Sequence, residues 1–246
     1  MIEIAAMFAA GFLAGVLNAI AGGGTFITFP TLVWLGVPVI SANATATLAA
    51  LPGYAGSAWA FRQDMAGLPL RRLMLLTAFG GAIGAALLIV TPPGVFRGIV
   101  PWLLLAATLL FAFGPRLLAA LRARGRGDAG PVTAGAALLA VAIYGGYFNG
   151  GLGIVLLAAF SLLGHQNLHA MNGMKNLAST VLSAISVLAF IAAGLIAWKA
   201  AAVMALATTL GGYAGARISR RITRTDLLRH FVVAVGLAMT LAFLVL

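Results

Sequence analysis

Near the start of the chain, Asn18-Ala-Ile-Ala-Gly22-Gly23-Gly24-Thr25 interrupts an apolar stretch, and Tyr147-Phe-Asn149-Gly150-Gly151-Leu-Gly153 does the same about 130 residues later. Two further motif pairs keep this offset: Ser41 to Thr47 with His169 to Asn176, and Gly80 to Ala85 with Gly211 to Ala216. Glycine-interrupted hydrophobic segments at matching positions of two halves are typical of transporters whose site lies between the repeats.

The composition predicts a chain embedded in lipid. Hydrophobic residues make up 63% of the 246 residues and charged residues only 8%, which is more apolar surface than a soluble fold of this length can bury. The chain has no cysteine, so disulfides and cysteine metal sites are excluded. Residues 1–7 contain Glu3 and no basic residue, so we expect the first apolar stretch to stay in the mature protein.

Apolar runs between breaks predict five hydrophobic segments in each half. These are 5–20, 25–36, 40–61, 69–90 and 94–115, followed by 131–149, 151–163, 168–193, 195–216 and 225–246. The third to fifth segments of each half suit the roughly 20 residues that span a bilayer, whereas the second segments have only about a dozen. We therefore interpret the first two segments of each half as short or broken helices that meet at a Gly-rich turn. Three complete but tilted crossings would preserve the same orientation.

The basic residues predict how the halves are oriented. Of the 15 Lys and Arg residues, 12 fall in three short loops: Arg62, Arg71, Arg72, Arg116, Arg122, Arg124, Arg126, Arg217, Arg220, Arg221, Arg224 and Arg229. Short basic loops stay in the cytoplasm by the positive-inside rule, so topology rather than nucleic-acid binding explains the net charge of +11. A basic loop follows the third segment of the first half but the fourth of the second, so the halves are antiparallel.

The predicted fold is an all-α polytopic membrane protein of two inverted-topology repeats. The first repeat covers residues 1–121, a cytoplasmic linker covers 122–130, and the second, inverted repeat covers 131–246. Each half crosses the membrane an odd number of times, which places both termini in the periplasm if the membrane is a bacterial inner membrane.

The two Gly-rich turns are the first candidates for a binding site. If helices begin after Gly24 and after Gly153, their free amide groups and positive dipole ends favour an anion. The competing interpretation is that these glycines only permit close helix crossing, the role expected of the pairs Gly11/Gly15, Gly80/Gly84 and Gly211/Gly215. The matching positions of the turns, and the flanking Asn18 and Asn149, favour a site.

Lys175 is the one cation well inside a predicted span, about two turns into the third segment of the second half. An ionisable residue within the membrane is by default a functional candidate, although its long stem could also reach the cytoplasmic face. The four acids, Glu3, Asp64, Asp128 and Asp226, fall at a terminus or in loops, which argues against cation antiport and metal transport. His165 and His169 are expected at a helix start, as interfacial residues or proton sensors.

Several stretches of the sequence resemble a known family of membrane proteins. The run GVLNAIAGGGTFITFPTLVWLGVPVISANATATLAA, its weaker echo in the second half and the two Gly-rich fourth segments resemble the sulfite exporter TauE/SafE family of bacterial membrane permeases. The family implies export, or in some members uptake, of sulfite and small organosulfonates such as sulfoacetate. The second repeat departs from the first by Leu152 within its turn and by Lys175 in place of Ala46.

These observations together predict a permease for a small sulfur-containing oxyanion. The expected site is formed on one side by Asn18, Gly22, Gly23, Gly24, Thr25, Asn43, Thr45 and Thr47, and on the other by Asn149, Gly150, Gly151, Gly153, Asn172, Gly173, Lys175 and Asn176. The alternatives are a membrane-embedded enzyme or assembly subunit, which lacks a nucleophile-base pair within the spans, and a cation carrier. No cofactor, metal or nucleic acid is expected, the partners are the anion and the lipid bilayer, and the oligomeric state is open.

Overall fold

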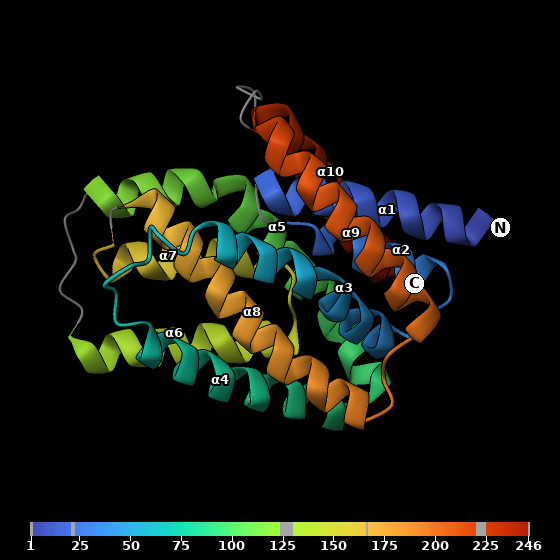
Figure 1. Cartoon of the computed structure of the whole chain (residues 1–246). Coiled ribbons are helices and arrows are strands. Elements are labelled where there is room, and N and C mark those ends of the chain that lie inside the picture. Colours follow the sequence, from blue (N-terminus) through green and yellow to red (C-terminus); the bar gives the residue numbers. More distant parts are fainter. Residues whose placement is uncertain (1, 21–22, 124–129, 166, 220–224, 246) are drawn as a thin grey trace.

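A computed structural model describes residues 2–20, 23–123, 130–165, 167–219 and 225–245. Within these residues all regular secondary structure is helical (Figure 1). The helices are α1 (Ile2–Ile20), α2 (Thr25–Trp34), α3 (Val39–Ala60), α4 (Leu70–Val90), α5 (Pro93–Ala123), α6 (Pro131–Tyr147), α7 (Leu152–Leu162), α8 (Leu168–Ala192), α9 (Trp198–Ser219) and α10 (Thr225–Val245). The ten predicted segments therefore match ten helices.

Two short helices follow the Gly-rich turns, as predicted. Helix α2 has 10 residues and α7 has 11, so at about 1.5 Å per residue each covers roughly half of a ~30 Å hydrocarbon core. Gly151 precedes α7 in the left-handed conformation, with φ of 70°, which glycine adopts without steric cost. Helix α7 begins at Leu152, so the prediction that it begins after Gly153 is wrong, and Gly153 lies within its first turn.

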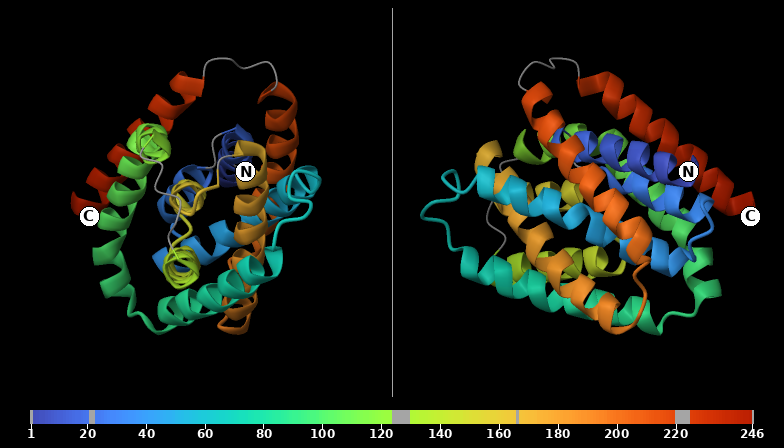
Figure 2. Two further views of the ribbon diagram at one scale, coloured as in Figure 1. Left: turned by 90° about the vertical axis from the view of Figure 1, so that its left-hand side faces the viewer. Right: turned by 45° about the vertical axis from the view of Figure 1, so that its right-hand side comes forward.

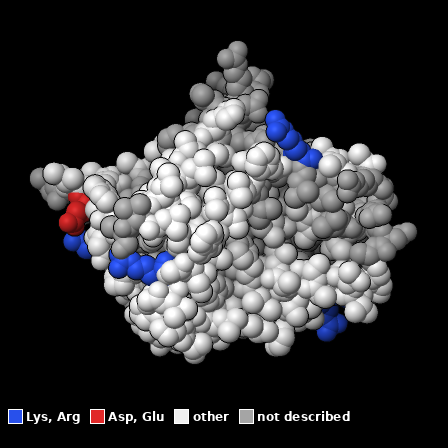
Figure 3. Space-filling model, turned by 180° about the vertical axis from the view of Figure 1, so that it is seen from behind, with Lys and Arg blue, Asp and Glu red and all other residues white. Residues whose placement is uncertain are grey.

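Most of the predicted loop arginines that the structure describes lie on helices rather than in loops. Helix α5 runs for 31 residues through Pro115, so Arg116 and Arg122, which we expected in a loop, belong to its last turns. Arg71 and Arg72 lie in the first turn of α4. On the face in Figure 3 the charged side chains of the described residues lie toward the margins of the molecule. Several predicted positions lie outside the described residues: Arg124, Arg126, Asp128, Arg220, Arg221 and Arg224.

The helices pair in a reciprocal pattern. Helix α1 packs along α9 and α4 packs along α6, while α3 packs on α8 and α5 on α10. The end-on view of Figure 2 (left) shows the short α7 enclosed between α5 and α8. The short helix that follows the second Gly-rich turn is thus covered by longer helices.

Close approach of glycine backbones makes two of these pairings possible. A Cβ at Gly15 on α1 would lie 2.2 Å from the Thr208 carbonyl oxygen of α9, and one at Gly84 on α4 would lie 2.2 Å from the Ile143 carbonyl oxygen of α6. Gly11, Gly80 and Gly211 are similarly close to the partner helix. The predicted packing role of these glycines is confirmed.

Two helices in the described part of the chain are long and apolar enough to cross a bilayer, Leu70–Val90 in α4 and His169–Ala192 in α8. Helix α3 has 22 residues but does not qualify, because polar residues such as Asn43 and Tyr54 lower its mean hydropathy. Those residues lie on a helix whose central part is buried against other helices. Protein rather than lipid therefore surrounds the polar part of α3.

Gly15→Ala should destabilise the fold, because the added methyl group meets the backbone of α9, which cannot move aside without separating the helices. We expect a loss of about 1–3 kcal/mol, as for other overpacked sites. Gly98→Ala on α5 is the control, since a Cβ there meets nothing within 4 Å. Thermal unfolding followed by size-exclusion chromatography in detergent would measure both, and equal midpoints would contradict the packing role.

Candidate functional site

The side chain of Asn149 links three helices and a turn at the centre of the molecule. Its amide oxygen accepts a hydrogen bond of 3.2 Å from the Tyr54 hydroxyl of α3, and its amide nitrogen donates one of 3.2 Å to Ser183 Oγ of α8. The Tyr54 hydroxyl also has a hydrogen-bonding contact with Thr25, the first residue of α2. Asn149 is only 1% exposed, so this network joins both Gly-rich turns inside the protein.

The second turn, residues 148–151, is tightly held. The Tyr144 hydroxyl donates to the Gly150 carbonyl, and the Phe148 ring packs edge-on against Phe29 of α2. A Cβ at Gly150 would lie 2.5 Å from the Phe148 ring, and one at Gly151 would lie 2.9 Å from Ala107 of α5. Both glycines are therefore required for packing, whatever else they do.

In the first Gly-rich turn, the side chain of Asn18 pairs with a backbone amide. Asn18 Oδ1 accepts a 2.7 Å hydrogen bond from the Gly24 amide, so this amide is already occupied. A Cβ at Gly24 would lie 2.5 Å from the Ala14 carbonyl oxygen, and Gly23 is buried. Gly22 lies outside the described residues.

Three predicted site residues on α3 have structural partners. Asn43 donates 3.0 Å to the Tyr147 carbonyl at the end of α6, and Thr47 donates to the Asn43 carbonyl. Thr45 accepts a 3.0 Å hydrogen bond from the Ala197 amide, in the connection between α8 and α9. The amide oxygen of Asn43 is buried and has no partner within the described residues, so Asn43 is the member of this group with unused hydrogen-bonding capacity.

Lys175 is enclosed by protein. Its side chain is 7% exposed, and its ammonium group donates a 3.2 Å hydrogen bond to Asn172 Oδ1 one turn earlier on α8. Asn176 is buried as well, and Gly173 allows close approach of Met65 and Phe61, since a Cβ there would lie 2.6 Å from the Met65 side chain. The side chain of Lys175 therefore faces protein rather than the bilayer.

A stripe of small hydroxyl side chains continues from Lys175 along α8. Ser179, Ser183 and Ser186 follow it at intervals of four, four and three residues, which keeps them on one face of the helix, and all three are buried. Ser183 contacts Asn149, and Ser186 donates 3.2 Å to the Gly81 carbonyl of α4. The stripe thus connects the buried cation to the central asparagine.

The structure divides the expected site into two parts. Thr25 and Asn149 belong to the central network, whereas Lys175, Asn172 and their neighbours lie two turns nearer the start of α8. Ser183 is eight residues beyond Lys175, which corresponds to about 12 Å along the helix. The lysine and the Gly-rich turns therefore do not meet around a single small ion in this conformation.

Tyr54 and Ser183 are central residues that the sequence interpretation missed. The signal for Ser183 was present, because its spacing of eight residues from Lys175 puts it on the same helical face. Tyr54 gave no comparable signal, since it follows Pro52 and Gly53 in a segment that resembles a helix end. Only the packing of α3 against α8 identifies it.

Two cavities open at the ends of the helices. The first, of about 120 Å³, is lined by the ends of α4, α6, α7 and α8, and the second, of about 310 Å³, lies between the connections α2–α3 and α8–α9. None of the predicted site residues lines either one. Within the described part of the chain, no three His, Asp or Glu side chains come together in a way that could hold a metal ion.

A helical fold that buries a lysine and an asparagine network among apolar helices is that of a polytopic membrane protein. The family model for the sulfite exporter TauE/SafE matches residues 7–243. The chain belongs to this family of membrane transporters.

Relatives of the chain agree with the transporter class. A "probable membrane transporter protein" of Haemophilus influenzae is 32% identical over 96% of this chain and 92% of its own length. A "probable membrane transporter protein ORF9" of a Sinorhizobium species is 30% identical over 98% and 92%. The "probable membrane transporter protein YfcA" of Escherichia coli strain K12 is 29% identical over 95% and 87%. No solved structure matches the chain.

Tyr54→Phe should destabilise the protein, because the buried amide oxygen of Asn149 loses its donor, at a cost of about 1–3 kcal/mol. Tyr147→Phe is the comparison, since its hydroxyl makes a longer bond of 3.4 Å to Thr91, which is half-buried, whereas Asn149 is buried. The midpoints of thermal unfolding in detergent should fall more for Tyr54→Phe. The reverse order would show that the central network contributes little.

Proposed function

We propose that the protein exports a small sulfur-containing oxyanion, such as sulfite or an organosulfonate, across the bacterial inner membrane. The observation that carries the proposal is the buried Lys175 ammonium, whose one described partner is the neutral Asn172. A cation buried without a carboxylate is costly unless an anion compensates its charge. The description of the matching family supplies the chemical class of that anion.

The polar stripe of α8 supports a path from Lys175 to the centre. Along it, hydroxyl groups of Ser179 and Ser183 would replace the water around the oxyanion. At the centre, the amides of Gly150 and Gly151 donate no hydrogen bond within the part of the chain that the structure describes, so they remain available to an anion. In the present conformation the Tyr54–Asn149–Ser183 network closes this path, and it has to open for passage.

The two halves, residues 1–121 and 131–246, are proposed to be inverted repeats joined by a cytoplasmic linker. The reciprocal pairings support this: α1 with α9 corresponds to α6 with α4, and α3 with α9 to α8 with α4. The two cavities also occupy matching junctions, one between the connections α3–α4 and α7–α8, the other between α8–α9 and α2–α3. Such symmetry places equivalent entrances on opposite sides of a membrane.

The direction of transport follows from the charge on the substrate. With the arginine-rich ends in the cytoplasm and both termini in the periplasm, an anion that leaves the cell moves down the inside-negative potential. Export then needs little additional coupling. No enzyme activity, cofactor or nucleic-acid partner is part of the proposal.

The inverted arrangement predicts that the end of α5 and the end of α10 lie on opposite sides. Because the chain has no cysteine, Ala123→Cys and Leu244→Cys can be labelled singly without further changes. In intact cells an impermeant maleimide should modify Leu244→Cys, whereas Ala123→Cys should react only after the membrane is opened. Reaction of both from the same side would exclude the inverted arrangement.

Lys175→Met should keep the apolar stem and remove the charge, so the protein should still insert while anion affinity falls by about 1–3 kcal/mol. Lys175→Arg should restore binding in part, since a planar fork replaces a compact ammonium. Lys199→Met is the control, because it removes the same charge from an exposed position at the start of α9.

Uptake of radiolabelled sulfite and sulfoacetate into liposomes that contain the purified protein would measure the effect. Unchanged flux in Lys175→Met would assign the lysine to a structural role. Absence of any flux by the unmodified protein would favour the rival class, a membrane-embedded enzyme or assembly subunit.

A further inference from the structure

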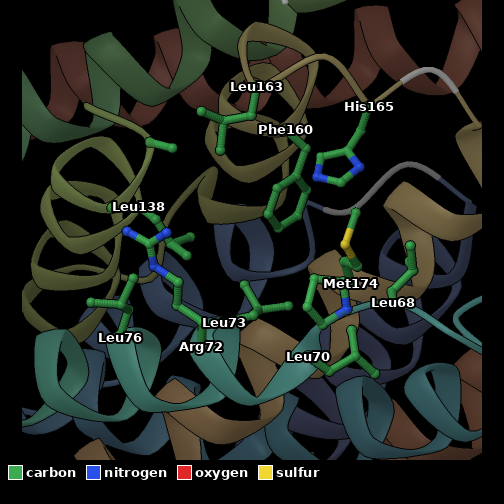
Figure 4. Close-up of a pocket in the computed structure, with 13 residues that line it drawn as sticks. Leu68, Leu70, Arg72, Leu73, Leu76, Leu138, Phe160, Leu163, His165 and Met174 are labelled. Carbon is green, nitrogen blue, oxygen red and sulfur yellow. The ribbon is translucent and has the colours of Figure 1, made fainter. Parts of the chain in front are cut away.

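A cavity at the arginine-rich end of the protein has a mainly apolar lining that also contains one arginine and one histidine side chain. Leu73 of α4, Leu138 of α6 and Phe160 of α7 form much of its wall, and Met174 of α8 closes one side. Among the described residues of the lining, Arg72 and His165 are the only charged or titratable ones, and none of these residues is a carboxylate. In the view of Figure 4, Arg72 reaches toward Leu138, whereas His165 lies on the other side of Phe160.

Arg72 is held in place and still has free donors. One guanidinium nitrogen donates to the Pro131 carbonyl at the start of α6, and the same nitrogen lies 2.7 Å from where a Cβ of Gly135 would be. A guanidinium group carries five N–H donors, so most of them remain for a ligand. The fork suits the oxygens of a sulfonate or a carboxylate.

His165 lies in the connection between α7 and α8, with its ring edge-on to Phe160. Burial lowers the pKa of His165 below its ordinary value of about 6.5, so the imidazole is neutral at pH 7. An anion bound beside the imidazole would favour its protonated form.

The second cavity does not share this chemistry. Its lining consists of residues 35–38, Ser41 and residues 194–197, with no charged side chain. The two cavities lie at matching junctions of the two halves, so the difference arises from the side chains rather than from the arrangement of helices. Of the two cavities, only the one at the arginine-rich end has a cation among the described residues of its lining.

We propose that the Arg72 cavity is a binding site for a small organic anion, with its oxyanion group on the guanidinium and a short alkyl chain against Leu73, Leu138 and Phe160. An ordered water needs about 10–15 Å³ of such volume, so about 120 Å³ admits a ligand of several non-hydrogen atoms. The site is separate from Lys175. It rests on the proposed function in one respect, that it would collect the substrate on the cytoplasmic side.

Alkanesulfonates are suitable probes, because they stay ionised over the whole working range of pH. Calorimetry on the full-length protein in phosphatidylcholine nanodiscs should show affinity rising about fourfold per methylene from methanesulfonate to propanesulfonate, and falling for octanesulfonate, which exceeds the cavity. Affinity that is independent of chain length would overturn the apolar half of the proposal.

Arg72→Gln should weaken propanesulfonate binding at least tenfold, and Arg72→Lys should retain part of it. Arg71→Gln is a matched control, since it removes the same charge from the same helical turn but does not line the cavity. Equal losses in Arg71→Gln and Arg72→Gln would mean that general surface charge attracts the anion, and would overturn the site.

Binding should also depend on pH through His165. The bound anion raises the pKa of His165 relative to the free protein, so affinity should increase as pH falls through the bound-state pKa and level off below the free-state pKa. His165→Gln should abolish this dependence and keep binding at pH 8. A dependence that persists in His165→Gln would contradict the assignment of the imidazole.

The outcomes separate this site from the proposed function. If propanesulfonate binds through Arg72 but no sulfite or sulfonate crosses liposomes, the transport proposal fails and the site stands. If Lys175→Met abolishes flux while Arg72→Gln binds propanesulfonate normally, transport stands and this site fails.

Discussion

The structure depends on one constraint: backbone groups freed at a break in a helix have to be kept away from lipid. Among the described residues, helices are interrupted at residues 23–24 and at residues 148–151, and each break leaves helix ends with unpaired amides or carbonyls. Asn18 satisfies one such amide at the first break, and Tyr144 satisfies a carbonyl at the second. Both breaks lie inside the protein, so the longer helices are arranged around them.

The glycine contacts follow from that enclosure. Covering α2 and α7 requires α1 and α6 to lie close to a helix of the other half, and there is room for this only where Cβ atoms are missing. Gly15 and Gly84 supply the space at α9 and α6 respectively. The same residue type therefore has two roles in this chain, turn formation at Gly151 and close helix crossing at Gly15, and spacing within an uninterrupted apolar run distinguishes the second role.

The sequence predicted most of the fold, because hydrophobic length and glycine breaks are local signals. The predicted segment 69–90 corresponds to Leu70–Val90, and the short segments after each turn are present. Helix α5 was predicted to end at residue 115 because Arg116 and Arg122 were expected in a basic loop, yet the helix continues to Ala123. The central network was not predictable, since Tyr54, Asn149 and Ser183 meet only through the packing of α3 on α8. Burial of Lys175 was expected from Asn172 and Asn176 beside it, but its separation from the turns was not.

The two halves differ in where they place cationic side chains, despite their similar helix arrangement. Lys175 takes the position that Ala46 has in the first half, and the Arg72 cavity corresponds to one without any charged residue. Both cations therefore belong to the same end of the molecule, and among the described residues neither the cavity lining nor the contact of Lys175 includes a carboxylate. On the proposed path an anion would meet Arg72 at the surface and Lys175 about two turns into α8, and the serine stripe ahead of it is neutral. In this proposal attraction weakens along the path, which would allow an anion to enter from this end and to leave from the other.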